Sequence, residues 1–148
     1  AAMAFGSGDD GKGTDGAYRQ TGLQGNSDRF GGKASFKYYG EVIDPELSNL
    51  TIFTLGAGID VTEKTSVDLI YHHYRQTVAD DDLGDSNLKE DPSGNSSHIG
   101  DEIDLIVGIR EIENVDSDLT GGVFIPGKAF EDNHDTAWYG EIEVSLKF

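Results

Sequence analysis

The sequence predicts an all-β fold, an antiparallel up-and-down transmembrane β-barrel to which this chain contributes about six strands. Segments of about ten residues alternate between apolar and polar positions, which is the pattern of a strand with two different environments. Short and long connections follow one another strictly along the chain, as periplasmic turns and extracellular loops do in outer-membrane barrels. The chain also ends on an aromatic residue, Phe148, which closes an alternating apolar series.

Six segments carry the alternation, and the last one is the clearest. From position 138 to 148 the even positions are mostly apolar and the odd positions mostly polar. A helix would place Glu141 and Ile142 on overlapping faces and would gain nothing from this order. The same test identifies earlier strands at 51–61, 66–72, 103–109 and 118–125, with a short opening strand at 1–6.

The connections predict one domain over residues 1–148. Two are tight turns, at about 62–65 and 113–117, and three are long loops, at about 7–50, 78–100 and 126–135. If the short turns lie in the periplasm and the long loops outside the cell, the last strand ends in the periplasm. Phe148 is then expected to act as a recognition signal for the barrel assembly machinery.

Composition excludes several classes of protein. The chain has 28 acidic and 11 basic residues, for a net charge of −17, and nucleic-acid binding depends on basic residues that neutralise phosphates. It has no cysteine, and no run of about 18 apolar residues that could form a membrane-spanning helix. We therefore expect no nucleic-acid partner, and outer-membrane lipids as the surroundings of the strands.

Six strands are too few for a closed barrel, because the smallest bacterial barrels have eight. An open edge in lipid would leave backbone N–H and C=O groups unpaired, at several kcal/mol each. The chain opens in mid-pattern without a methionine, as a processed or truncated product would. We expect missing N-terminal strands of the same protein, or other chains, to complete the wall.

The polar positions of the strands predict which side chains face the lumen. No arrangement of a nucleophile, a base and a carboxylate is convincing, so an enzyme is not expected. The expected lumen-facing residues are Asp60, Asp68, His72, Asp104, Arg110, Tyr139, Glu141, Glu143 and Lys147. Most of these are acidic, and a wall of this sign repels a polyanion.

The long loops carry most of the remaining acid. Clustered carboxylates suit Ca²⁺, and Asp80, Asp82 and Asp85 form the densest cluster, although they do not match the twelve-residue calcium loop. A solvated, mobile surface explains the same cluster. His72 and His73 are adjacent, so on a strand they point to opposite faces and cannot bind one ion together. No cofactor is expected, and Ca²⁺ in the loops stays an open alternative.

Three functions fit these features. The first is an outer-membrane channel or porin for passive transport or export of a hydrophilic solute. The second is an acidic, calcium-dependent surface binding module, folded as an antiparallel sandwich. The third is a barrel scaffold that encloses a partner protein; the chain has no haem-attachment motif of its own.

Several fragments resemble the C-terminal part of the alginate export family of bacterial outer-membrane β-barrels. They read AFGSGDD at 4–10, YRQTGLQ at 18–24, YGEVIDPELSNL at 39–50, YHHYRQ at 71–76, GDEIDL at 100–105 and FIPGKAF at 124–130. The resemblance implies a monomeric barrel of about 18 strands in a Gram-negative outer membrane. It also implies export of a polysaccharide through an arginine-lined lumen, and the acidic positions of this chain depart from that pattern.

Overall fold

The computed structural model describes residues 1–9, 11–20, 26–130 and 135–148. These residues contain no helix that could serve as a membrane span. Their regular structure is entirely β. The strands are β1 (Ala2–Phe5), β2 (Ser27–Asp28), β3 (Phe36–Lys37), β4 (Leu50–Thr62), β5 (Thr65–Gln76), β6 (His98–Ile109), β7 (Val115–Pro126) and β8 (Ala137–Leu146).

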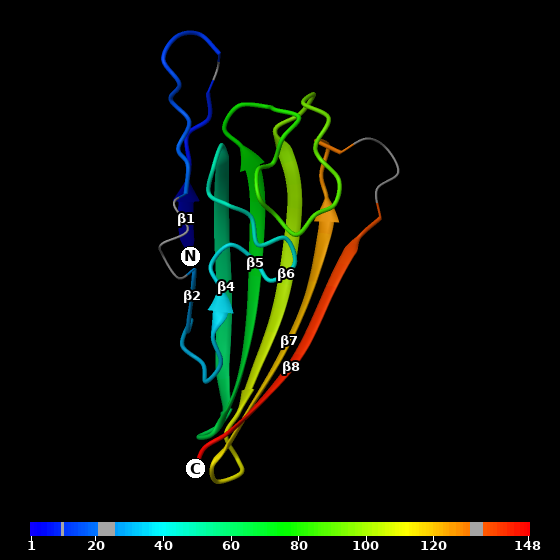
Figure 1. The fold of residues 1–148 in the computed structure, drawn as a ribbon. Helices are drawn as coiled ribbons and strands as arrows, with labels where there is room; N and C mark the ends of the chain where they lie inside the picture. Colours follow the sequence, from blue (N-terminus) through cyan, green and yellow to red (C-terminus); the bar gives the residue numbers. More distant parts are fainter. Residues whose placement is uncertain (10, 21–25, 131–134) are drawn as a thin grey trace.

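The strands form one large sheet and one small one. The large sheet has six strands in the order β1-β4-β5-β6-β7-β8, each antiparallel to its neighbour, and β2 pairs with β3. Figure 1 shows the long strands of the large sheet side by side. This up-and-down order confirms the predicted antiparallel all-β fold, as part of a barrel wall.

The two ends of the sheet differ in their connections. Only residues 63–64 join β4 to β5, and residues 110–114 join β6 to β7, at what we call the short-turn end. Residues 77–97 and 127–136 make the links at the opposite, long-loop end. The C-terminus lies at the short-turn end (Figure 1).

The outer face of the large sheet is apolar and exposed. Leu55, Ile59, Leu69, Leu105 and Ile142 all point outward and are between 46% and 74% exposed. Contiguous apolar surface of this extent marks a membrane or a protein interface. The alternation in the sequence therefore places apolar side chains toward the surroundings, the reverse of a soluble domain.

The inner face carries the polar side chains, and those in its middle are buried. Ser66, Asp68, His72, Glu102 and Asp104 have at most 3% of their surface exposed. A segment of the chain covers them: residues 26–49, here called the inner loop, cross the inner face of the sheet (Figure 1). The predicted long loop at 7–50 is therefore not free along its whole length, because its second half folds back along the strands.

Apolar residues of the inner loop pack against apolar residues of the sheet. Toward the long-loop end, Val42 and Ile43 of the loop pack with Ile52, Tyr74 and Phe124 of the strands. Nearer the short-turn end, a second cluster joins the loop to the middle of β5 and β6; its members are Ala34, Phe36, Ile70 and Ile106. Strands β2 and β3 were not predicted, because two-residue strands have no measurable periodicity.

Strands β1 and β8 form the two edges of the large sheet, and within the described residues they do not pair with one another. Unpaired edges present rows of N–H and C=O groups. The expectation that further strands complete the wall therefore remains a prediction, as does the total number of strands.

Candidate functional site

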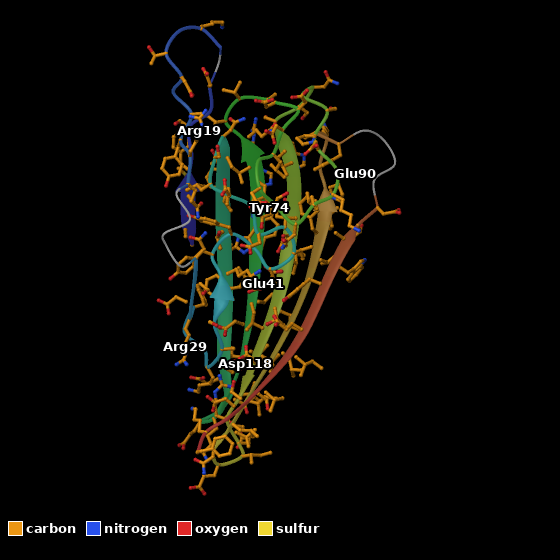
Figure 2. The ribbon with its side chains drawn as sticks, viewed as in Figure 1. Arg19, Arg29, Glu41, Tyr74, Glu90 and Asp118 are labelled. Atoms are coloured by element: carbon orange, nitrogen blue, oxygen red, sulfur yellow. The ribbon has the colours of Figure 1, made fainter. Side chains whose placement is uncertain are left out.

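The inner face and the inner loop together form the candidate site. Figure 2 labels Tyr74, Glu41 and Asp118 at successive heights from the long-loop end toward the short-turn end. Glu41 belongs to the loop, and the other two to strands. The contacts between loop and wall fall into two groups, one around Tyr74 and Glu41 and one around Asp118.

Glu102 of β6 holds the loop nearer the long-loop end. Its Oε1 atom accepts a hydrogen bond from the backbone N–H of Val42 at 2.7 Å, and its Oε2 from that of Ile43 at 3.2 Å. The Tyr74 hydroxyl donates to the same carboxylate at 3.3 Å. Hydrogen bonds to a charged group contribute about 1.5–3 kcal/mol each, so this buried carboxylate is a strong anchor.

The next inward-facing carboxylate on β6 extends this anchor. Asp104 Oδ2 accepts the backbone N–H of Glu41 at 3.4 Å and lies 3.6 Å from His72 Nε2. The other ring nitrogen of His72 is 2.9 Å from the Thr54 hydroxyl. Three successive backbone N–H groups of the loop, at 41–43, thus point at two wall carboxylates, the arrangement that makes backbone segments bind anions.

Gly40 lets the loop approach the wall this closely. Its φ is +105°, a conformation that residues with a Cβ atom rarely adopt. A Cβ atom at this position would also collide with the Tyr74 hydroxyl and lie 2.6 Å from Glu102 Oε1. The glycine therefore permits both the turn and the contact.

Arg110 holds the loop at the short-turn end. Its guanidinium makes a bidentate pair with Asp118, at 2.6 and 3.1 Å, and its Nη2 donates to the backbone O of Lys33 at 3.0 Å. The Nε atom lies 3.4 Å from Asp116. The fork geometry of arginine allows one side chain to join two strand carboxylates to the loop.

The loop also brings cations to the acidic wall. Lys33 Nζ lies 3.4 Å from Asp60, and Lys37 Nζ lies 2.8 Å from Asp44 and 6.0 Å from the centre of the Tyr139 ring. Lys33 therefore pairs with an acid of the wall, whereas Lys37 pairs with an acid of the loop itself. The repulsion expected from the sequence alone is reduced only where the loop contacts the wall.

A cavity of about 190 Å³ remains between the loop and the last two strands. Glu141 and Glu143 of β8 line it together with Asp118, and Lys37 and Glu41 line it from the loop. No ion pair to either β8 carboxylate is found among the described residues. Glu141 and Glu143 thus place negative charge in this cavity that no ion pair with the loop neutralises among the described residues.

The predicted lumen-facing residues separate into three groups, with Lys147 apart from them. Asp68, His72 and Asp104 are buried under the loop, whereas Asp60, Arg110 and Tyr139 contact it at its lysines. Glu141 and Glu143 line the cavity. Lys147 lies just past β8 and pairs with Asp116 at 2.7 Å.

Glu102 and the whole inner loop were not among the predicted site residues. The alternation does place Glu102 on the same face as Asp104, so the sequence contained a signal for it. The loop gave no comparable signal, because its docking depends on contacts between distant segments.

The acidic residues proposed as calcium ligands do not gather in the structure. The described residues whose ligand atoms cluster are His73, His98 and Asp101, a group that omits Asp80, Asp82 and Asp85. Asp82 Oδ1 instead accepts the backbone N–H of Gly84 at 2.7 Å. A local turn accounts for this contact.

A model of the alginate export family matches residues 1–139. The chain belongs to the alginate export family. The alginate production protein AlgE of Pseudomonas aeruginosa is 30% identical over 137 residues, 82% of this chain and 28% of that relative. AlgE of Azotobacter vinelandii is 27% identical over 158 residues, 92% of this chain and 33% of that relative. The chain thus spans about a third or less of the curated relatives it matches.

Membership in the alginate export family confirms the resemblance and the predicted location. Members are outer-membrane β-barrel proteins of Gram-negative bacteria, so the large sheet is a segment of an outer-membrane barrel wall. The family consists of transport proteins. The single large sheet also excludes the sandwich that the calcium-dependent module required.

Glu41 gives the loop of this alginate export family member a pH dependence. Burial raises the pKa of Glu41 above its ordinary value of 4.5, whereas the Lys37 backbone N–H that donates to it lowers the pKa. Asp44, Glu141 and the wall residue Asp104 also face it. A carboxyl with a raised pKa binds more protons folded than unfolded, so its contribution to stability falls as pH rises from 4.5 through the folded pKa.

We expect the change Glu41→Gln to reduce this dependence. The wild-type barrel should lose more of its free energy of unfolding between pH 4.5 and pH 8 than the variant does. Urea unfolding of both proteins in detergent, measured across that range, checks the difference. Equal pH profiles would mean that Glu41 does not titrate in the docked loop.

Proposed function

We propose that the chain forms part of the wall of an outer-membrane channel that exports a hydrophilic polymer, and that the inner loop narrows its lumen. The short-turn end faces the periplasm and the long-loop end faces outside. Transport is passive, with the inward-facing charges setting selectivity, and the protein catalyses no reaction.

The observation that carries this proposal is the inside-out distribution of side chains. Residues such as Leu55 and Ile142 are exposed on the outer face, and carboxylates such as Glu102 are buried on the inner one. In water this arrangement is unfavourable, since apolar surface stays exposed while charges lose their hydration. In a membrane it suits both faces, because lipid covers the first and a polar lumen the second.

The family and the two relatives support an anionic polysaccharide as the solute. The matching model is described as alginate export, and both relatives are named for alginate production. The acidic wall is compatible with such a solute, because Arg110, Lys33 and the backbone N–H groups of the loop bind five of its carboxylates, namely Asp60, Glu102, Asp104, Asp116 and Asp118. Glu141 and Glu143 remain as the main local barrier to a polyanion.

Other partners follow from the same placement. Lipid chains contact the apolar outer face, and the barrel assembly machinery recognises the C-terminal Phe148, which lies beyond β8 and is fully exposed. Further strands, from the same protein or another chain, pair with β1 and β8. Enclosure of a partner protein is a second use of such a barrel, and no contact within the described residues favours it.

Single-channel conductance of the complete barrel protein in a planar bilayer tests the proposal. We expect an open pore whose current is blocked by soluble alginate oligomers added on the periplasmic side. The double change Glu141→Gln with Glu143→Gln should lower the alginate concentration for half block roughly twofold or more, because it removes two negative charges from the path.

The matched control is Glu63→Gln, in the exposed turn between β4 and β5. It removes one negative charge of the same kind outside the lumen and should leave the block unchanged. A barrel that conducts but is indifferent to alginate would contradict the assignment of the solute. A barrel that does not conduct under any condition would contradict the channel itself.

A further inference from the structure

Three side chains with metal-binding chemistry meet on the outer face near the long-loop end. His73 Nδ1 lies 2.9 Å from Asp101 Oδ1, and His98 Nε2 lies 3.5 Å from Asp101 Oδ2. The two imidazole rings are stacked with their centres 5.2 Å apart. The ligand atoms of all three residues lie within 4.8 Å of one another.

A β-bulge produces this meeting. His98 and Asp101 are three positions apart, so a regular strand would point them to opposite faces. The register instead shifts between Tyr74 and Arg75: Tyr74 pairs with Gly100 and Arg75 with His98, leaving Ile99 as the extra residue on β6. The shift turns His98 to the outer face, where His73 and Asp101 already lie opposite each other.

Gly100 allows the bulge to form. Its φ is +151°, a conformation that L side chains rarely adopt. A Cβ atom there would come within 2.7 Å of the Phe124 ring and would collide with the backbone O of Ile125. Bulges commonly re-aim a side chain next to a functional site, and this one adds the second histidine to the cluster.

The surroundings suit a divalent metal ion more than a simple ion pair. Each of the three side chains is about one-third exposed, so an ion can enter from outside the barrel. The Tyr71 hydroxyl donates to Asp101 Oδ1 at 2.5 Å and so holds the carboxylate in place, as partners of metal ligands do. His98 Nε2 is buried and has no hydrogen-bond partner among the described residues.

We propose that His73, His98 and Asp101 form a binding site for Zn²⁺ or a similar transition-metal ion at the outer rim of the barrel. Two imidazoles and one carboxylate are the ligand set of open zinc sites, in which water completes the coordination. Bonds of about 2.0–2.2 Å join ligand atoms that lie about 3–4 Å apart, so small side-chain rotations suffice. The ion links β5 to β6 at the bulge.

This site is separate from the acidic loops and from the lumen. Ca²⁺ prefers oxygen ligands, whereas two of the three ligands here are nitrogens, which suit Zn²⁺ and Cu²⁺. His72, the neighbour of His73, points to the inner face and contacts Thr54 instead. The metal ion therefore stabilises the rim of the barrel and does not contact the transported solute.

Isothermal titration of the complete, chelator-treated barrel protein with ZnCl₂ in detergent tests the site. We expect the change His98→Asn to remove one equivalent of bound Zn²⁺ or to weaken its affinity about tenfold or more, since loss of a supporting residue alone costs that much. Titration with CaCl₂ should not differ between the two proteins. Comparing variant with wild type separates this site from any other in the barrel.

Two further variants and a measurement of thermal stability distinguish specific binding from a general effect. His73→Asn should have the same effect as His98→Asn, whereas Asp91→Asn, an exposed acid of the neighbouring loop, should have none. Zn²⁺ should raise the unfolding temperature of the wild type and the Asp91→Asn variant but not of the two histidine variants, because it stabilises only a protein that binds it. Heat-modifiable gel mobility establishes that each variant is folded.

The proposal is overturned if the wild type binds no Zn²⁺ that the histidine variants lack. It is also overturned if Ca²⁺ binding is lost in parallel with Zn²⁺ binding, since that result indicates a general effect of charge or folding.

Discussion

The change Glu102→Gln is expected to free the inner loop from the wall. Glutamine has the shape of glutamate, but its amide group offers one oxygen acceptor, and its NH₂ faces a backbone N–H. One of the bonds from Val42 and Ile43 is then lost, and the other loses its charged acceptor. The cost is about 2–3 kcal/mol, which corresponds to roughly 30- to 150-fold faster amide exchange if local opening limits exchange.

Hydrogen exchange followed by mass spectrometry measures this effect on peptides that contain Val42 and Ile43. The same variant should raise the single-channel conductance, because the loop no longer stays against the wall. Glu63→Gln in the exposed turn is the control and should change neither quantity. Unchanged protection at 42–43 would show that the apolar contacts of the loop suffice to hold it.

The change Arg110→Ala is expected to destabilise the short-turn end of the barrel. It leaves Asp116 and Asp118 without their shared cation and removes the donor to the Lys33 backbone. Breaking such a network costs about 3–5 kcal/mol when it is fully buried. The Arg110 side chain is 19% exposed, so we expect about 2–4 kcal/mol.

Guanidinium unfolding in detergent measures the loss, and limited proteolysis at Lys33 reports release of the loop. Arg110→Lys keeps the charge but not the fork, so its effect should be intermediate. Arg75→Ala is the control: within the described part of the chain this exposed side chain makes one hydrogen bond, to Ser97, and its loss should cost about 0.5 kcal/mol or less. Equal stabilities of the Arg110→Ala and Arg75→Ala variants would contradict the anchor.

The two anchors are compatible with an acidic wall in the proposed channel for a polyanion. Nearer the long-loop end, backbone N–H groups of the loop bind Glu102, and at the short-turn end Arg110 binds both Asp118 and the loop backbone. These charges hold the loop and do not face the open lumen. Glu141 and Glu143 border the remaining cavity, which makes them the residues through which charge acts on a solute.

The strands were predictable because alternation is a local property of a strand between two environments. The residues from 50 to 62 read as one strand, since every second side chain must suit lipid and every other one must suit the interior. The predicted segments fall within the observed strands except at the two ends of the chain, where Ala1 and Gly6 flank β1 and Lys147 and Phe148 lie beyond β8. Propensity and periodicity locate the middle of an element better than its ends.

The position of the inner loop was not predictable from the same signal. Its contacts join Val42 to Glu102 and Lys33 to Arg110, residues 60 and 77 positions apart. No pattern within a window of ten or fifteen residues carries such a pairing. Gly40 can be read from the sequence, but the side chains that require a glycine there, Tyr74 and Glu102, belong to two distant strands.

Residue order alone determined the alternating strands, the sorted connections and hence the antiparallel barrel wall, because each follows from neighbouring residues and from the two solvents they meet. Tertiary structure decided what the acidic side chains do, since the sequence does not distinguish a carboxylate that faces water from one that, like Glu102, accepts two backbone N–H groups. It also decided the meeting of His98 with His73, because a single bulge reverses the face that strict alternation assigns.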